Sequence, residues 1–311
     1  MEIIIQFVLL AVGFLLLIKG ADWFVEGASG IAGRFGISQL VIGLTIVAMG
    51  TSAPEAAVSI ASALKGNAGI TIGNVIGSNI MNILVILGVT AIIVSVPVQK
   101  STLRYEIPFL ILVSGVLLIQ GFDGTVSRFD GIVLWVLFII YFIYLIVMAK
   151  KGSQQPEASE KGKGKKGWIL FLLTIIGMAM VVLGSDVTVD SASAIADAFG
   201  MDSRLIGLTI VAFGTSLPEL VTSVIAAKKG STDIAIGNIV GSNIFNILFV
   251  VGTTGLIAPV HFQTKFLIDA VIAIASVVLL LLCTIRNRKI TAAGGITMLA
   301  AYAGYFIYLV I

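Results

Sequence analysis

Residues 42–55 read IGLTIVAMGTSAPE, and residues 206–219 read IGLTIVAFGTSLPE. Twelve of these fourteen aligned positions are identical, at a fixed offset of 164. Each segment ends in a single carboxylate, Glu55 or Glu219, and each lies within a strongly apolar stretch. A repeated unit that carries an ionisable residue at membrane depth is typical of secondary transporters.

A second pair of segments extends the repeat at the same offset. Residues 72–84 read IGNVIGSNIMNIL and residues 236–248 read IGNIVGSNIFNIL, with ten of thirteen positions identical. The chain therefore contains one unit twice.

The composition is that of a membrane protein. Hydrophobic residues make up 58% of the chain and charged residues only 11%, and apolar stretches long enough to cross a bilayer recur throughout. We expect an all-α polytopic membrane protein with ten transmembrane helices, at residues 3–32, 40–64, 70–96, 104–121, 130–148, 168–198, 205–227, 235–258, 266–284 and 291–310. The first and sixth exceed the ~20 residues that a crossing needs, so we expect them to be tilted or partly interfacial.

The two copies are expected to cross the membrane in opposite directions. Equivalent segments lie five spans apart, an odd number, which predicts two inverted five-helix repeats. With the N-terminus outside, fourteen basic residues lie on the cytoplasmic side: Arg34, Lys100, Arg104, Lys150, Lys151, Lys161, Lys163, Lys165, Lys166, Lys228, Lys229, Arg286, Arg288 and Lys289. Four lie outside: Lys65, Arg128, Arg204 and Lys265. The excess of positive charge predicts a multi-pass protein of the cell membrane with both termini outside.

The chain divides into a first transmembrane half (1–149), a linker (150–167) and a second half (168–311). The linker, KKGSQQPEASEKGKGKKG, has no apolar periodicity and is expected to be a flexible cytoplasmic tether. It is too short for a calcium-sensing domain. The net charge of +3 reflects topology rather than nucleic acid binding, and the expected surroundings are the lipid bilayer, with no obligate protein partner evident.

Each copy of the first segment combines a polar stripe with a predicted helix break. The stripe follows the i, i+3, i+4, i+7 spacing of one helix face: Ala48, Thr51, Ser52 and Glu55 in one copy, and Ala212, Thr215, Ser216 and Glu219 in the other. A proline lies in each stripe, Pro54 or Pro218. Proline has no N–H, so the carbonyls of Gly50 and Gly214 lose their helical partners. Carbonyl, hydroxyl and carboxylate oxygens then converge around the break, as a hard cation requires.

The second pair of segments adds neutral oxygens. Polar residues recur every four positions: Asn74, Ser78 and Asn82 in one copy, and Asn238, Ser242 and Asn246 in the other. Small-xxx-small glycine patterns in the same segments allow helices to approach closely. Packing explains these glycines, but it does not explain the amides, because a buried amide in lipid is costly without a partner.

Together the repeated segments predict a cation site. Two carboxylates carry −2 and repel at close range, so the pair requires cations or protons. All the candidate ligands are oxygens, which favours Ca²⁺, Na⁺, Mg²⁺ or H⁺ over Zn²⁺ or Cu⁺. A flexible cage of many oxygens suits Ca²⁺ better than the tight octahedron of Mg²⁺.

The GTS-x-PE and GN-x-x-GSN-x-x-N segments resemble the two α-repeats of the sodium/calcium exchangers, in the calcium/cation antiporter superfamily. The resemblance covers the whole chain and is to the prokaryotic type without a regulatory domain. It implies that Glu55 and Glu219 are the central ligands shared by Ca²⁺ and Na⁺. It also implies that flanking Na⁺ sites are formed by hydroxyls and carbonyls, with further polar positions at the centre: Thr51, Ser52, Thr215, Ser216, Ala48, Ala212, Ser78, Ser242, Asn82 and Asn246.

One position departs from this family. Well-known sodium/calcium exchangers carry Asp at the position of Asn246, whereas both repeats here have Asn. Two carboxylates still neutralise one Ca²⁺, but this departure leaves the identity and the number of the counter-ions open. The expected function is Na⁺/Ca²⁺ antiport by alternating access, electrogenic, with transported ions and no prosthetic group. The alternatives are a Ca²⁺/H⁺ antiporter and, less favoured, a cation channel. No nucleophile or cofactor motif accompanies the carboxylates, so an enzyme is not expected.

The remaining ionisable residues are expected to lie outside this site. Asp22 and Glu26, with their counterparts Asp186 and Asp190, fit a solvated or interfacial helix face. His261 lies beside a proline in a short outer loop, without neighbouring ligand types.

Overall fold

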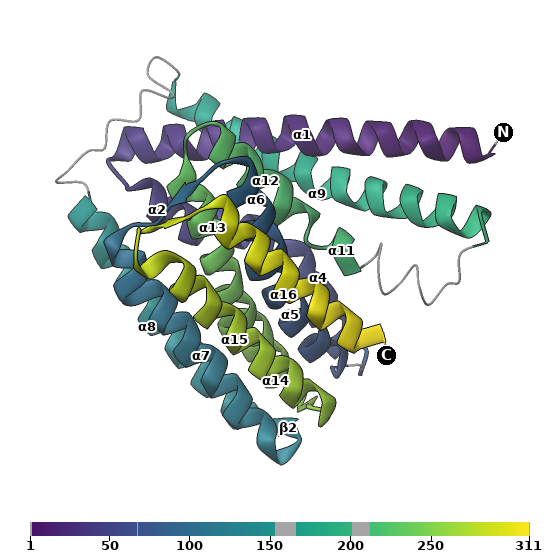
Figure 1. Ribbon diagram of the computed structural model, residues 1–311, viewed down its shortest axis with the longest axis vertical. Coiled ribbons are helices and arrows are strands. Elements are labelled where there is room, and N and C mark those ends of the chain that lie inside the picture. The colour runs from purple at the N-terminus through teal and green to yellow at the C-terminus, as the bar shows by residue number, and fades with distance from the viewer. Residues whose placement is uncertain (1, 67, 153–165, 201–211, 311) are drawn as a thin grey trace.

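A computed structural model describes residues 2–66, 68–152, 166–200 and 212–310, and these are all-helical apart from four two-residue strands (Figure 1). The first half contains α1 (Glu2–Phe35), α2 (Gln39–Ile42), η1 (Gly43–Val47), α3 (Ala48–Thr51), α4 (Ala53–Leu64), α5 (Ile70–Met81), η2 (Asn82–Leu87), α6 (Gly88–Ile93), β1 (Val96–Pro97), η3 (Thr102–Glu106), α7 (Ile107–Gln120), η4 (Gly121–Asp123), β2 (Thr125–Val126) and α8 (Arg128–Gly152).

The second half follows the same order. It contains α9 (Gly167–Ala198), α11 (Ala212–Gly214), α12 (Leu217–Lys228), α13 (Thr232–Phe245), η6 (Asn246–Val251), α14 (Gly252–Ile257), β3 (Val260–His261), α15 (Lys265–Ile285), β4 (Lys289–Ile290) and α16 (Ala292–Val310). Several boundaries match the first half at the offset of 164: α4 with α12, η2 with η6, and β1 with β3.

The polytopic membrane fold is confirmed. Within the described residues, eight helices are long and apolar enough to cross a membrane, or nine when the pair Gln39–Thr51 and Ala53–Leu64, bent by 49°, counts as one span. The predicted span at 205–227 includes residues outside the described part. Most of the linker at 150–167 also lies outside it. The count of ten helices and their inverted crossing therefore stay predictions.

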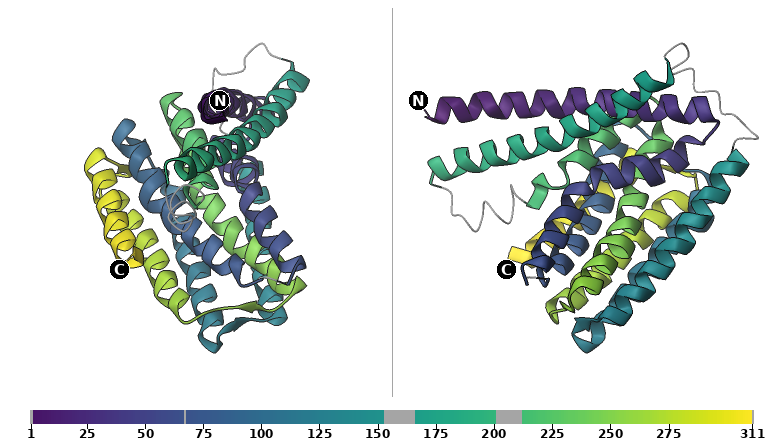
Figure 2. Two further views of the ribbon diagram at one scale, coloured as in Figure 1. Left: turned by 90° about the vertical axis from the view of Figure 1, so that its right-hand side faces the viewer. Right: turned by 180° about the vertical axis from the view of Figure 1, so that it is seen from behind.

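Helices α1 and α9 run side by side and extend beyond the rest of the bundle (Figures 1 and 2). Glycines make this close approach possible. A Cβ at Gly20 would lie 2.7 Å from Met180 Cβ and 2.9 Å from the carbonyl oxygen of Gly177. A Cβ at Gly13 would lie 2.4 Å from Thr188 Oγ1. The crossing thus depends on small residues spaced by seven along α1, the small-residue packing found between membrane helices.

Two helix runs form the centre of the bundle: α5 with η2 and α6, and α13 with η6 and α14. Most side chains of both runs are buried, which is why their sequences are apolar on nearly every face. The segments η1, η2, η3 and η6 are π-helical, a widening of the helix that is often found at functional sites.

Two strand pairs join the halves, and each pair takes one strand from each half. Strand β1 pairs antiparallel with β4 through Val96 and Ile290, and β2 pairs with β3 through Val126 and Val260. Because Val260 and Ile290 are the counterparts of Val96 and Val126, the two pairings are images of each other. The halves are therefore tied together at opposite ends of the bundle.

Candidate cation-binding site

The helix breaks lie where the sequence predicts them. Ser52 ends α3 and precedes α4 with φ −82° and ψ 8°, and Ser216 precedes α12 with φ −93° and ψ 4°. Pro54 and Pro218 occupy the first turns of the following helices, where a missing N–H costs least. The carbonyl of Gly214, which Pro218 deprives of its helical partner, accepts a 2.8 Å hydrogen bond from Ser185 Oγ of α9.

The two predicted carboxylates are fully buried in the first turns of the helices after the breaks. Glu55 is 1% exposed and Glu219 is 0% exposed. They are near enough for the charge on one to act on the other. The positive end of each helix dipole favours a negative charge at these positions. Ser52 Oγ donates a 2.9 Å hydrogen bond to Glu219 Oε1, so a hydroxyl of the first half contacts the carboxylate of the second.

Within the described part of the chain, several oxygens of the predicted site have no hydrogen-bond partner. They are buried side-chain atoms of the repeated motifs: Glu55 Oε2, Glu219 Oε2, Asn82 Oδ1, Asn246 Oδ1 and Ser216 Oγ. The carboxylate and amide oxygens are acceptors only, and leaving them buried without a donor or cation is costly. Helix η2 packs against α12, and η6 packs against α4. Each asparagine thus begins a segment that contacts the helix carrying the other half's carboxylate.

The neutral residues of the stripes also meet across the two halves. Ser242 Oγ donates to the carbonyl oxygen of Ala48 at 3.3 Å, and Thr51 Oγ1 donates to Asn238 Oδ1 at 3.0 Å. The amide of Asn238 in turn donates to Ser223 Oγ at 3.0 Å. These contacts bring the broken first segment of one repeat onto the second segment of the other.

The equivalent positions of the opposite pairing lie partly outside the described residues. Ser78 is buried and Thr215 is partly buried, while the side chain of Ala212 lies outside the described part. A Cβ at Gly241 would lie 2.8 Å from Ala48 Cβ. Helix α13 therefore packs closely on η1 and α3 of the first half.

Two further asparagines, Asn79 and Asn243, were not among the predicted site residues. Each is buried, and each donates from its amide to the backbone carbonyl of the other, at 3.2 and 3.0 Å. They lie one position beyond the Asn-Ser stripe, so the four-residue spacing does not include them. The identical GSN triplets of both repeats were the available signal.

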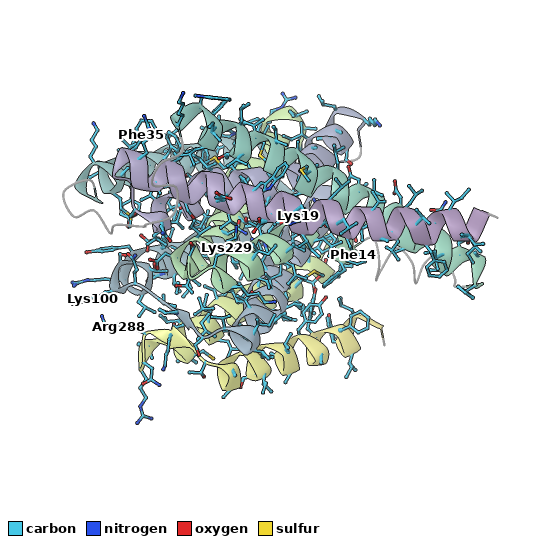
Figure 3. The ribbon with its side chains drawn as sticks, turned by 90° about the horizontal axis from the view of Figure 1, so that it is seen from above. Phe14, Lys19, Phe35, Lys100, Lys229 and Arg288 are labelled. Carbon is cyan, nitrogen blue, oxygen red and sulfur yellow. The ribbon has the colours of Figure 1, made fainter. Side chains whose placement is uncertain are left out.

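The other ionisable candidates lie at the margin of the bundle. Asp22 is 38% exposed and pairs with Lys229 at 2.5 Å, which ties α1 to α12 beneath it (Figure 3). His261 is exposed in β3 and pairs with Thr125 of β2. Lys100 and Arg288, both predicted to be cytoplasmic, lie at the same end of the molecule, next to the β1–β4 pair (Figure 3).

Comparison with known proteins finds a matching family and similar chains. The sequence model of the family described as "Sodium/calcium exchanger protein" matches residues 5–147 and 169–311, two ranges related by the same offset as the motifs. A protein named putative antiporter CaxA from Alkalimonas amylolytica is 40% identical, over 94% of this chain and 95% of its own length. A protein named sodium/calcium exchanger MaX1 from Methanosarcina acetivorans is 32% identical, over 99% of both chains.

Solved structures of a sodium-calcium exchanger superimpose on this chain over almost its whole length. A structure of the sodium-calcium exchanger NCX_Mj, soaked with Na⁺, superimposes with a TM-score of 0.85 at 36% identity, covering 98% of this chain and 99% of that one. Another NCX_Mj structure, soaked with Na⁺ and Ca²⁺, has a TM-score of 0.84 at 35% identity, covering 98% of both chains.

Proposed function

We propose, since the chain belongs to the sodium/calcium exchanger family, that it is a secondary antiporter that exchanges Na⁺ for Ca²⁺ by alternating access. The family is one of transporters, and the protein is not an enzyme. The names of its relatives support both ions: one is named a sodium/calcium exchanger, and the NCX_Mj structures were soaked with Na⁺, Ca²⁺ or Sr²⁺.

One observation carries the proposal: two fully buried carboxylates, each with an oxygen that has no hydrogen-bond partner among the described residues, lie in the first turns of the helices that follow the two breaks. Buried charge without a counter-charge is strongly unfavourable. Glu55 and Glu219 must therefore be neutralised by cations or protons whenever the site is closed. Na⁺ and Ca²⁺ then compete for the same pair, so that exchange is favoured over leak.

Each proposed ligand has its own part. Glu55 and Glu219 form the shared centre, and the carbonyl oxygens of Asn82 and Asn246 complete it. The flanking Na⁺ ions are held by neutral oxygens, from the hydroxyls and carbonyls of Thr51, Ser52, Thr215, Ser216, Ala48, Ala212, Ser78 and Ser242. The contact between Ser242 Oγ and the Ala48 carbonyl supports one such flank, because it brings two of these oxygens together.

Charge balance favours electrogenic exchange. With Asn at both 82 and 246, the centre carries −2, which one Ca²⁺ or two Na⁺ cancel. A third Na⁺ held by neutral oxygens leaves the loaded carrier at +1, and moving that charge is worth about 2.3 kcal/mol per 100 mV. We therefore expect more than two Na⁺ per Ca²⁺.

The proposed topology has two inverted halves, 1–149 and 168–311, joined by a cytoplasmic linker at 150–167, with both termini outside the cell membrane. The reciprocal strand pairs support it. Lys100, Arg288 and Lys289 gather at the β1–β4 end, whereas Lys265 follows the β2–β3 pair at the other end. Positive charge is expected on the cytoplasmic side of a membrane protein.

The test is ⁴⁵Ca²⁺ uptake into proteoliposomes that contain the purified protein. Uptake driven by an outward Na⁺ gradient is expected, with little uptake when the gradient is absent. Uptake driven by a pH gradient without Na⁺ would instead indicate a Ca²⁺/H⁺ antiporter, in which protons neutralise the carboxylates. Ca²⁺ current without any counter-ion gradient would indicate a channel.

A further inference from the structure

Four asparagine side chains form one hydrogen-bonded network at the centre of the bundle. Asn79 Nδ2 donates to the carbonyl oxygen of Asn243 at 3.2 Å, and Asn243 Nδ2 donates to that of Asn79 at 3.0 Å. Asn82 Nδ2 donates to Asn243 Oδ1 at 2.9 Å, and Asn246 Nδ2 donates to Asn79 Oδ1 at 3.3 Å. Every bond of the network therefore connects one half of the chain to the other.

The backbone carbonyls determine the direction of every bond in this network. A carbonyl oxygen only accepts, so the Asn243 side chain must direct its NH₂ group at Asn79. Its Oδ1 then faces Asn82, which must present its own NH₂ group. The remaining end of the Asn82 amide is its carbonyl oxygen, which is buried and has no hydrogen-bond partner among the described residues. The same reasoning leads from Asn79 to Asn246.

We propose that Asn79 and Asn243 are positioning residues, which turn the amides of Asn246 and Asn82 so that oxygen, and not NH₂, faces the transported cations. This inference rests on the proposed function and adds a role for two residues that do not themselves contact the ions. A reversed Asn82 amide would direct its NH₂ group at a cation and its oxygen at Asn243 Oδ1, and both contacts are repulsive.

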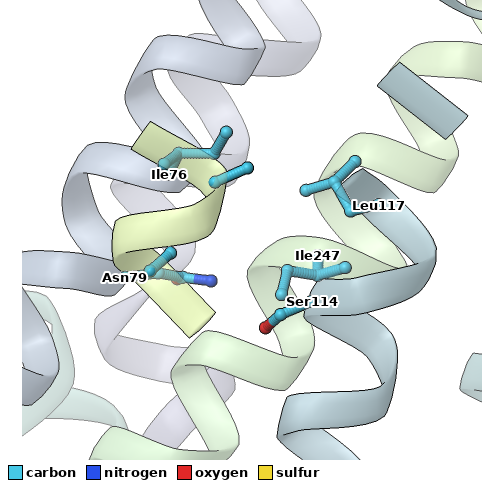
Figure 4. A pocket seen from close by; sticks show the side chains of 7 residues that line it. Ile76, Asn79, Ser114, Leu117 and Ile247 are labelled. Carbon is cyan, nitrogen blue, oxygen red and sulfur yellow. The ribbon is translucent and has the colours of Figure 1, made fainter. Parts of the chain in front are cut away.

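The surroundings of Asn79 offer little to replace a lost bond. A cavity of about 10 Å³ lies beside it, lined by Ile76, Ser114, Leu117, Ile247 and two alanines (Figure 4). That is close to the least volume that holds one water molecule. Ser114 is the one other polar side chain in its lining. One water molecule and Ser114 are thus the replacements that this cavity offers for a lost bond of the network.

Double-mutant cycles test the proposal, with half-saturating Ca²⁺ for Na⁺-driven uptake into proteoliposomes as the readout. Leu substitutions keep most of the side-chain volume and remove the hydrogen bonds. Asn243→Leu is expected to raise half-saturating Ca²⁺ about tenfold, as for the loss of an orienting hydrogen bond. In the Asn82→Leu background, Asn243→Leu should change the half-saturating Ca²⁺ concentration little further, because Asn243 acts through Asn82. In the Asn246→Leu background, the effects of the two substitutions on this concentration should multiply.

A merely structural role of Asn79 and Asn243 would not produce this pattern, in which each couples to one specific asparagine of the other half. Asn79 should likewise couple to Asn246 and not to Asn82. The proposal would be overturned if the effects of Asn82→Leu and Asn243→Leu on the half-saturating Ca²⁺ concentration multiplied. It would also be overturned if Asn243→Leu left that concentration unchanged. If a Leu variant does not fold, as judged by thermal unfolding in detergent, the same cycle with Ser gives the comparison. Absence of Na⁺-driven uptake in the unmodified protein would instead reject the proposed function.

Discussion

Ser52 donates its hydrogen bond to Glu219, a carboxylate of the other half, while the hydroxyl of Ser216, the counterpart of Ser52, has no hydrogen-bond partner among the residues that the structure describes. The two repeats have the same residues at these positions but different bonds. In this conformation the Glu219 carboxylate is held through one oxygen, and the surroundings of the two carboxylates are not equivalent. Sequence symmetry thus coexists with an asymmetric arrangement of hydrogen bonds at the two carboxylates.

Removing either carboxylate charge should nearly abolish Ca²⁺ exchange. Glu55→Gln and Glu219→Gln keep the side-chain shape but each removes half of the charge of the site. Loss of one partner of a buried charge pair costs about 3–5 kcal/mol, which is more than about a hundredfold in affinity. ⁴⁵Ca²⁺ uptake into proteoliposomes measures the effect.

A buried carboxylate outside the site provides the matched control. Asp269 is 8% exposed on α15 and accepts a 3.1 Å hydrogen bond from Tyr305, which Asn can still accept. Asp269→Asn should leave uptake near normal. Normal flux in both glutamine variants would refute the central site.

The flanking serines should affect Na⁺ more than Ca²⁺. Ser52→Ala and Ser216→Ala each remove one neutral oxygen, worth about 1 kcal/mol or a factor of about five in affinity. Because Ca²⁺ is held mainly by the carboxylates, the Na⁺ concentration for half-maximal exchange should rise more than that for Ca²⁺. Titrating each ion at a fixed concentration of the other separates the effects. A loss of Ca²⁺ affinity with unchanged Na⁺ activation would contradict the assignment.

The linker should be shielded from reagents outside the cell. In a Cys283→Ala background, a cysteine at Ser153 should not react with an impermeant thiol reagent applied to intact cells. A cysteine at Thr264, exposed beside β3 and predicted to be outside, should react. The reverse pattern would invert the orientation and leave the repeat intact.

Exchange should respond to membrane voltage. At a fixed Na⁺ gradient, ⁴⁵Ca²⁺ flux is measured while a K⁺/valinomycin potential is varied. With three Na⁺ per Ca²⁺, one net charge moves per cycle, so a 100 mV change alters the driving force by about 2.3 kcal/mol. Flux that is indifferent to voltage would indicate two Na⁺ per Ca²⁺.

Close packing of α1 on α9 should be sensitive to one added methyl group. Gly20→Ala places a Cβ within 2.8 Å of the Val181 backbone nitrogen, so the helices must separate. Overpacking of this kind costs about 1–3 kcal/mol, and the Tm in detergent should fall. Gly115→Ala on α7 meets nothing within 4 Å and should not lower it. Equal Tm values for the two variants would show that the crossing tolerates side chains.

The sequence predicted the elements whose signals are local or repeated. The breaks at Ser52 and Ser216 followed from nearby glycine and proline, and the buried carboxylates followed from charge in an apolar stretch. The strand pairs were not predicted, because two residues carry no periodicity and the partner is far along the chain. The roles of Asn79 and Asn243 were missed for a related reason: the direction of an amide is determined by residues of the other half.

The reciprocal strand pairs also bear on the order in which the protein is made. Val96 and Pro97 are synthesised long before their partners, Ile290 and Lys289, which belong to the other half of the chain. Because synthesis proceeds at about 5–20 residues per second, β1 has no strand partner for on the order of ten seconds or more. The first half must therefore persist in the membrane as a partly assembled intermediate, and a chain that stops before Lys289 leaves one end of the bundle untied.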